Sequence, residues 1–295
     1  MKKCVILACL IIAVSLGVCY AQTESNTNNK TQKEDWAKKD KLDKRRWRYL
    51  FQGNYLNYSY NLKADIQGNP SQEFKCNLVM TGISFGYEKQ FESGFFNEGS
   101  LYFAKGRGKF KSTMGDTNLD KASLFEWKEK VGIVLPINED DKGNVLKMGP
   151  FSGFNLQNIS FHLKEIEKSI DDYQANIFFS CPVGVRTEYS MISGWKFSLD
   201  IEYDFIISED SFRFQYPISI DEWHDGHVFQ LIGNISKGVA DNRLTFKLSP
   251  FYRFVDYGEC EMKIYDPENP GTFKKEKGVF KGKSHELGLK FGVQF

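Results

Sequence analysis

The feature that most constrains this chain is an alternation of apolar and polar side chains with a period of two. At the C-terminus the apolar positions of this pattern are Leu287, Leu289, Phe291, Val293 and Phe295. Because successive side chains of an extended strand point to opposite faces, such a segment has one apolar face and one polar face. The alternation recurs over most of the sequence and predicts an all-β protein.

The alternation predicts about ten strands. They cover residues 46–62, 74–91, 95–111, 122–137, 146–163, 173–191, 194–209, 226–238, 242–262 and 284–295. The connections at 92–94, 138–144, 192–194 and 239–241 are short, whereas those at 63–73, 112–121, 164–172, 210–225 and 263–283 are mostly longer and polar. Short turns on one side and longer loops on the other are typical of bacterial transmembrane barrels, whose short turns face the periplasm.

The pattern by itself fits two environments. A soluble, lipocalin-like ligand-binding barrel turns its apolar stripe inward, and an outer-membrane barrel turns the same stripe toward lipid. Several strands exceed the ~9–11 residues that cross a bilayer, and aromatic residues lie near strand ends, as interfacial aromatics do. These aromatics are Trp47, Tyr49, Trp127, Tyr189 and Trp195. We therefore predict that residues 46–295 form an antiparallel up-and-down transmembrane β-barrel, with the soluble ligand carrier as an alternative.

The polar faces of these strands predict the lining of the lumen. The candidates are Arg186, Glu188, Asp200, Glu202, Asp204, Lys247 and Arg253. Both charge signs are present, so these side chains can neutralise one another across strands. A ten-stranded barrel encloses little more than its own side chains. We expect polar and charged groups to fill most of the lumen. These groups should pair with one another rather than line a path for ions.

The N-terminus has the pattern of a secretory signal peptide. Lys2 and Lys3 precede an apolar stretch from Val5 to Val18, and small residues end at Ala21. This order predicts cleavage before Gln22, with a retained helical anchor or lipidation at Cys19 as alternatives. Residues 22–45 are polar and rich in Asn, Thr and Lys, which predicts a periplasmic leader that does not fold alone.

The C-terminal strand resembles a known signal. The ending Leu287-x-Leu289-x-Phe291-x-Val293-x-Phe295 is similar to the C-terminal signal of Gram-negative outer-membrane proteins. That resemblance implies recognition by the barrel-assembly machinery and an outer-membrane location, with outer-membrane lipid and lipopolysaccharide as neighbours. The stretches 184–189 and 249–254 also resemble strands of small outer-membrane barrels.

One polar cluster before the eighth strand suggests chemistry. Asp225 and His227 share one face of a strand, and with ten strands this pair resembles the Asp-His pair of omptins, which are outer-membrane proteases. The facing segment offers only Asp116 and Asp120, four residues apart and without the Asp-x-Asp arrangement of that family. We interpret the cluster as a solvated rim, with an omptin-like protease as the alternative and a weak metal site at His224 and His227 as a further one.

The remaining polar features do not specify a cofactor. After cleavage the cysteines are Cys76, Cys181 and Cys260. One disulfide between two of them is possible, but their spacing is not that of a zinc site. The run Lys105-Gly106-Arg107-Gly108-Lys109 lacks Walker spacing and is interpreted as a strand end. The last long loop is basic through Lys274, Lys275, Lys277, Lys281 and Lys283. Solvation is the interpretation adopted for this loop, and contact with lipopolysaccharide phosphates is the alternative.

The overall balance of charge excludes one class of partner. With 39 basic and 38 acidic residues, the formal net charge is +1, which does not favour binding to nucleic acid. The sequence therefore predicts a surface-exposed structural or interaction protein, or a narrow porin, without a cofactor and with an unidentified extracellular ligand.

Overall fold

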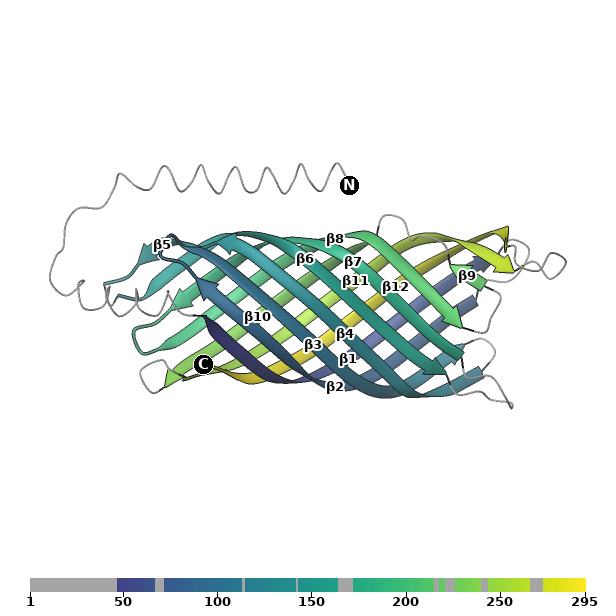
Figure 1. Cartoon of the computed structure of the whole chain (residues 1–295), viewed down its shortest axis with the longest axis horizontal. Helices are drawn as coiled ribbons and strands as arrows, with labels where there is room; N and C mark the ends of the chain where they lie inside the picture. The colour runs from purple at the N-terminus through teal and green to yellow at the C-terminus, as the bar shows by residue number, and fades with distance from the viewer. Residues whose placement is uncertain are drawn as a thin grey trace.

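In the computed structural model of the chain, tilted strands close into a cylinder (Figure 1). The structure describes residues 47–66, 72–112, 115–141, 143–163, 172–214, 218–220, 226–239, 244–265 and 273–295. The wall consists of β1 (Arg48–Ile66), β2 (Gln72–Gln90), β3 (Phe95–Ser112), β4 (Gly115–Ile133), β6 (Val145–Leu163), β7 (Asp172–Ser190), β8 (Trp195–Phe214), β10 (His227–Val239), β11 (Leu244–Tyr265) and β12 (Phe273–Gln294). Each of these strands pairs antiparallel with two neighbours, and β1 closes the cylinder against β12. Two short strands, β5 (Leu135–Glu139) and β9 (Ile218–Ile220), pair with the wall near its two ends.

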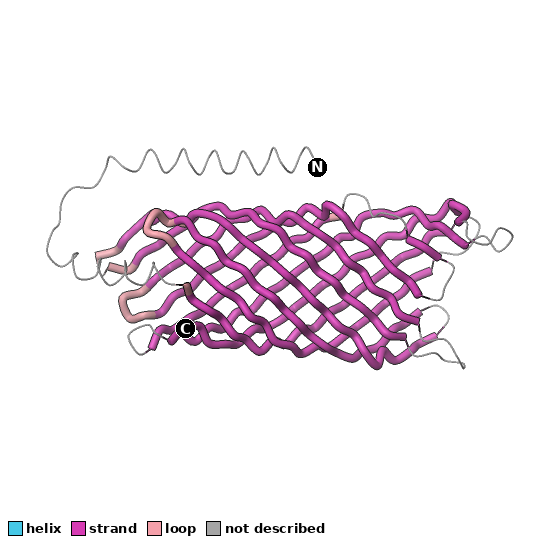
Figure 2. The backbone as a smooth tube through the Cα atoms, viewed as in Figure 1, coloured by secondary structure: helices cyan, strands magenta, loops and turns pink. Residues whose placement is uncertain are grey.

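The predicted all-β barrel of ten strands is confirmed. Two predicted short turns are also confirmed, and each contains a glycine with positive φ: Gly94 at 85° and Gly194 at 82°. In the first turn the Phe91 amide donates to the Phe95 carbonyl at 2.7 Å, and in the second the Met191 amide donates to the Trp195 carbonyl at 2.8 Å. Glycine adopts this backbone conformation without steric cost. Figure 2 shows the described turns and loops at one end of the cylinder, where the C-terminus also lies.

The strands at the opposite end are longer than the sequence indicated. β4 begins at Gly115 rather than near 122, and β12 begins at Phe273 rather than near 284. The prediction of one long loop over 263–283 is therefore wrong: Lys274, Lys275, Lys277, Lys281 and Lys283 lie in β12, which pairs with β11 as far as Phe273. Beyond the lipid, outward positions no longer need apolar side chains, so alternation fades while backbone pairing continues.

One predicted strand is divided in two. The segment expected over 122–137 ends its pairing with β3 at Ile133 and continues as β5, which pairs only with β6. β3 begins at Phe95, so the wall partner of β4 stops there, and the amide of Val134 instead donates to the carbonyl of Gly94 at 2.9 Å. The hairpin of β5 and β6 thus extends past the neighbouring turn.

The outer surface of the barrel carries an apolar band. Along β8 the outward side chains include Phe197, Leu199, Ile201 and Tyr203. Along β12 they include Leu287, Leu289 and Phe291, followed by Phe295 directly after the strand. These residues are exposed, whereas Asp200 and Glu202 between them are buried. A soluble carrier requires the opposite distribution, so the lipocalin-like alternative is wrong. In lipid a closed antiparallel barrel pairs every backbone donor and acceptor without an edge.

Aromatic residues mark the end of the apolar surface near the short turns. Of the five predicted aromatics, Trp47, Tyr49, Trp127 and Trp195 are exposed there, and Tyr189 is half-buried. Glu129 lies among them and accepts hydrogen bonds from the Tyr87 hydroxyl at 2.5 Å and from Trp127 Nε1 at 3.1 Å. Such rings with one polar atom are typical of the boundary between lipid and water. The described residues contain no helix long and apolar enough to cross a membrane.

Candidate functional site in the barrel lumen

A layer of charged side chains crosses the middle of the lumen. We call it the charged layer, and it comprises Glu98, Glu126, Lys128, Lys130, Arg186, Asp200, Glu202, Arg253 and Glu286. These groups come from inward positions of β3, β4, β7, β8, β11 and β12. Strand alternation brings them inside, because each is flanked by outward side chains in its own strand. Except for Glu98, which is partly exposed, their side chains are buried.

Asp200 on β8 is the centre of one half of the layer. Arg186 Nε and Nη2 donate to its two carboxylate oxygens at 2.8 and 2.7 Å, a bidentate pair between neighbouring strands. The same Nη2 also donates to Glu98 Oε2 at 2.7 Å. Lys130 Nζ lies 3.2 Å from Asp200 Oδ2 and 2.8 Å from Glu202 Oε2. Since β4 and β8 are not neighbours in the wall, the Lys130 contacts span the lumen.

Arg253 on β11 is the centre of the other half. Its guanidinium pairs with Glu126 and lies 3.2 Å from Glu286 Oε2, and its Nη1 donates to Gln157 Oε1 at 3.1 Å. Gln230 joins the two halves, because its Oε1 accepts from Lys128 Nζ at 2.8 Å and from Arg253 Nη2 at 3.4 Å. Lys128 in turn pairs with Glu202. The lumen is therefore bridged by one connected set of ion pairs and hydrogen bonds.

Six of the seven predicted lumen residues are buried inside the barrel, and the seventh, Lys247, is half-buried beside a cavity. Arg186, Asp200, Glu202 and Arg253 belong to the charged layer. Ser180 Oγ donates to Asp204 at 3.2 Å, and Glu188 pairs with Lys196 at 2.8 Å nearer the short turns.

Sequence reasoning missed the lumen groups Glu126, Lys128, Lys130, Glu286 and Glu98. The period-two pattern could have identified three of them in β4, where Glu126, Lys128 and Lys130 alternate with the outward residues Phe125 and Trp127. The alternation identifies which face these residues occupy, but it cannot say which strand faces them across the lumen.

The prediction of a largely polar lumen is wrong for half of the barrel. Toward the end opposite the short turns, the lumen holds a packed apolar cluster, which we call the aromatic plug. Its members are Leu56, Tyr58, Tyr60, Cys76, Leu78, Met80, Tyr102, Ala104, Leu119, Ala122, Leu124, Ile159, Phe161, Phe178, Val228, Phe251, Val255 and Tyr257. In β1 at this height Leu56 and Tyr58 face the lumen while Asn57 and Ser59 face outward, which is the reverse of the lipid-facing stripe. Binary patterning separates the two faces, but it does not say which of them is the interior.

Tyr257 is at the centre of the aromatic plug. Its ring lies 5.6 Å from that of Tyr60 and 6.0 Å from that of Phe178, both at steep interplanar angles. Its hydroxyl lies 3.3 Å from the Tyr58 hydroxyl and 3.3 Å from Ser284 Oγ, so these three buried hydroxyl groups are paired. Lys290 packs against the plug, because its Nζ lies 5.1 Å from the centroid of the Tyr102 ring and 5.2 Å from that of the Phe251 ring.

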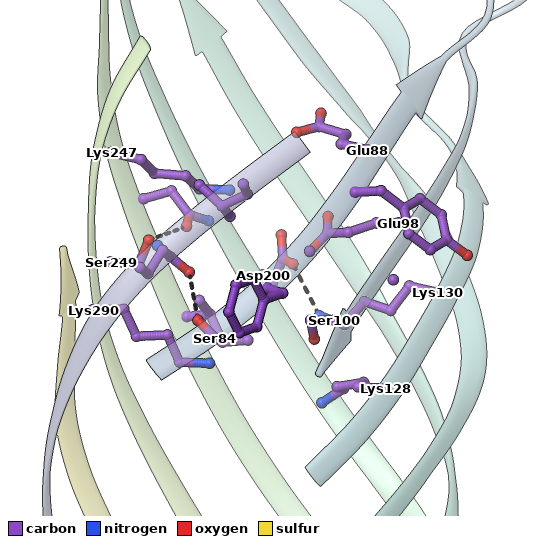
Figure 3. A pocket seen from close by; sticks show the side chains of 18 of the residues that line it. Ser84, Glu88, Glu98, Ser100, Lys128, Lys130, Asp200, Lys247, Ser249 and Lys290 are labelled. Atoms are coloured by element: carbon purple, nitrogen blue, oxygen red, sulfur yellow. Dashed lines mark hydrogen bonds and ion pairs between the residues drawn. The ribbon is translucent and has the colours of Figure 1, made fainter. Parts of the chain in front are cut away.

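A cavity lies on the other side of the charged layer, toward the short turns (Figure 3). It has a volume of about 70 Å³, and its lining includes Ser84, Glu88, Lys247, Ser249 and Lys290. Since one water needs roughly 10–15 Å³ of such volume, the cavity has room for a few waters. Figure 3 shows Lys128, Lys130 and Asp200 at its border, so the charged layer forms one of its walls.

The residues of the suggested protease site are only partly described. His227 begins β10 and lies on the outer face of the barrel, where its ring stacks on Tyr203 at 5.5 Å and contacts Phe254 at 6.5 Å. His224 and Asp225 lie outside the described residues, as do the side chains of Asp116 and Asp120. Among the described residues no group of His, Cys, Asp or Glu is arranged to hold a metal ion.

The one disulfide that the sequence allows does not include Cys76. This residue is a free thiol buried in the aromatic plug. Cys181 lies in β7, and the side chain of Cys260 lies outside the described residues.

Comparison with solved structures identifies a protein of the same fold. The structure is similar to the outer membrane protease OmpT from Escherichia coli, with a TM-score of 0.63 and 10% identity, over 84% of this chain and 96% of that one. It also matches the outer membrane protein OprG from Pseudomonas aeruginosa, with a TM-score of 0.39 and 11% identity over 85% and 97% of the two chains. No protein-family model and no curated protein sequence matches the chain. At 10% identity the likeness to OmpT shows the fold alone, which is that of an outer-membrane β-barrel.

Proposed function

We propose that this chain is an integral outer-membrane β-barrel of a Gram-negative bacterium that keeps its lumen closed and serves as a surface-exposed structural or interaction protein. The observation that carries the proposal is the stacking of the aromatic plug on the charged layer. Two successive layers of packed side chains occupy the lumen, so an open aqueous path would require both to move. Wide channels occur in barrels of 16 to 18 strands, well above ten.

The proposal includes the route of export. Residues 1–21 act as a cleaved signal peptide, residues 22–45 as a periplasmic leader, and the C-terminal strand as the signal for the barrel-assembly machinery. In support, Leu287, Leu289 and Phe291 are exposed on the outer face of β12, and Phe295 directly after the strand is exposed as well. The amide of Phe295 donates to the carbonyl of Tyr49 at 3.0 Å, so the last residue pairs next to the start of β1 and helps to close the barrel.

Membrane fractionation together with conductance tests this proposal. We expect the mature chain in the outer-membrane fraction, with a gel mobility that shifts on heating, and no conductance steps in planar bilayers at neutral pH. Regular steps from folded protein would contradict the closed lumen and support a narrow porin. A soluble periplasmic pool without a mobility shift would contradict the membrane location.

The position of His227 favours a non-enzymatic role. A protease acting at the lumen mouth needs its imidazole turned inward, whereas this ring packs with Tyr203 and Phe254 on the outer face. We expect the purified barrel to cleave no peptides from a mixed library. Cleavage that is lost in both Asp225→Ala and His227→Ala, with heat-modifiable mobility intact, would instead establish the protease alternative.

A further inference from the structure

The cavity on the short-turn side of the charged layer is lined by two lysines that the layer does not use. They are Lys247 on β11 and Lys290 on β12, and Figure 3 shows both beside the cavity. The other cations of the lining, Lys128, Lys130 and Arg253, all pair with acids of the charged layer. Within the described part of the chain, neither Lys247 nor Lys290 has an ion pair or a hydrogen bond through its ammonium group. Both are therefore available to a ligand.

The two lysines project from the same face of neighbouring strands. Lys247 is opposite Gly292 in the register of β11 and β12, and Lys290 lies two residues before that glycine. Both point into the lumen, because Phe246 and Phe291 beside them in the strands point outward. Diagonal pairs of this kind are about 7–8 Å apart at Cα, within reach of long side chains. Two like charges at this separation repel each other, and one anion bound between them removes the repulsion.

Gln52 on β1 adds a third donor beside the lysines. It is opposite Gly292 in the register of β1 and β12, so the glycine lies between Gln52 and Lys247 across three neighbouring strands. A Cβ at Gly292 would lie 2.5 Å from Gln52 Cγ, because the glutamine side chain leans over the glycine. Gln52 is 5% exposed and lines the cavity. Its Oε1 accepts from Ser84 Oγ at 3.3 Å, whereas its Nε2 has no hydrogen-bond partner among the described residues. A buried donor of this kind calls for an acceptor.

The acids of the lining that lie outside the middle of the layer already have donors. Glu98 Oε2 on β3 accepts from Arg186 Nη2 at 2.7 Å, and Glu88 Oε2 on β2 accepts from Gln294 Nε2 at 3.1 Å. The unmatched groups of the cavity are thus donors, and they lie together on β11, β12 and β1. This distribution favours an anion over a cation or a zwitterion.

The size and position of the cavity restrict the ligand to a small solute. Its volume of about 70 Å³ is far below the roughly 300–1,000 Å³ of pockets for drug-sized molecules. Lys247 and Glu88 are half-buried and lie near the ends of β11 and β2 at the short turns. The charged layer and the aromatic plug close the other side. A solute therefore reaches the cavity from the short-turn side, which is the periplasm in the proposed location.

We propose that this cavity binds one small oxyanion, such as inorganic phosphate, between Lys247, Lys290 and Gln52. The two ammonium groups donate charge-assisted hydrogen bonds to its oxygens, and the Gln52 amide donates a further one. An oxyanion has several acceptor atoms, which matches donors that come from three different strands. The side from which the anion enters rests on the proposed outer-membrane location, whereas the binding itself does not.

The test is equilibrium dialysis of the full mature chain in non-ionic detergent against radiolabelled inorganic phosphate, at constant sodium chloride. Sulfate, acetate and glycine serve as unlabelled competitors. The double variant Lys247→Met/Lys290→Met removes both cations of the site, and Gln52→Met removes the amide while keeping the length of the side chain. The matched control is Lys89→Met/Lys237→Met, which removes two cations that lie over aromatic rings near the short turns. Heat-modifiable mobility shows which variants are folded.

We expect one phosphate per folded chain, displaced by sulfate but not by glycine. Binding should weaken about 100-fold in the lysine variant, since each hydrogen bond to a charged group contributes on the order of tenfold. Gln52→Met should weaken it about fivefold, and the control variant should bind as the parent does.

Three results would overturn the proposal. The first is no saturable binding of phosphate by the folded parent. The second is a lysine variant that binds as well as the control variant does. The third is displacement of phosphate by glycine but not by sulfate or acetate, because Glu88 and Glu98 would then hold an ammonium group of a zwitterion. Fractionation tests the membrane location separately, so a failure of the site and a failure of the proposed function are distinguishable.

Discussion

The two halves of the lumen are built on the same wall but use opposite chemistry. Toward the end opposite the short turns, the aromatic plug fills the lumen with apolar side chains. In the middle, the charged layer fills it with ion pairs. Apolar packing loses stability in proportion to the volume removed, because dispersion and burial are spread over many contacts. A charged layer depends on complete pairing, because one missing partner leaves a buried charge uncompensated.

The largest expected effect is in the charged layer. Arg253→Met leaves Glu126 and Glu286 buried without their cation, and should lower the free energy of unfolding by about 3–5 kcal/mol. The measurement is urea unfolding in detergent micelles, followed by tryptophan fluorescence. Adding Glu126→Gln and Glu286→Gln to this variant should recover most of the loss. If the triple variant is no more stable than the single one, incomplete pairing is not the cause.

A smaller and graded effect is expected in the aromatic plug. Tyr257→Ala removes the ring that contacts Tyr60 and Phe178, and should cost about 3 kcal/mol in the same unfolding measurement. Tyr257→Phe removes only the hydroxyl contacts to Tyr58 and Ser284 and should cost about 1 kcal/mol. Equal losses in the two variants would show that the hydroxyl network, rather than ring packing, stabilises this half.

The close approach of β3 to the plug predicts an intermediate effect. Gly108→Ala places a methyl group against the Asn77 carbonyl and Leu78, and overpacking of this kind costs roughly 1–3 kcal/mol. Gly53→Ala is the matched control, since its Cβ would meet only the Phe291 carbonyl oxygen at 4.0 Å. We expect the control to change the free energy of unfolding by less than about 1 kcal/mol. If Gly53→Ala is as destabilised as Gly108→Ala, the sheet does not tolerate alanine in place of glycine in general, and the close contact at Gly108 is not the cause.

The smallest effect should come from an ion pair on the outer face. Lys283 Nζ lies 3.3 Å from Asp256 Oδ2, and the lysine side chain is 57% exposed. Exposed pairs contribute about 0.2–1 kcal/mol, so Asp256→Asn should cost no more than that and should lose its effect at high salt. Unfolding in 0.05 M and 0.5 M salt measures this difference. If Asp256→Asn lowers the free energy of unfolding as much as Arg253→Met does, and equally at both salt concentrations, then ion pairs in the lumen and on the outer face do not differ in their contribution to stability.

The sequence predicted the positions of the ten strands because lipid enforces alternation where the wall crosses it. β8 and β12 show this clearly, with apolar outward residues and polar inward residues in strict order. It also predicted the lumen groups Arg186, Asp200 and Arg253. It failed in β4 and β12 beyond the apolar band, where backbone pairing continues without a side-chain pattern.

The sequence by itself determined the all-β class, the strand number and the face on which most side chains lie, because these follow from local periodicity. Only the tertiary structure decided which face meets lipid, that Lys128 and Lys130 reach β8 across the lumen, and that Tyr58 meets Tyr257 in an apolar plug. These facts depend on closing the sheet into a cylinder. Closure brings together residues that are 70 to 199 positions apart in the sequence, and a pattern with a period of two carries no information about such pairs.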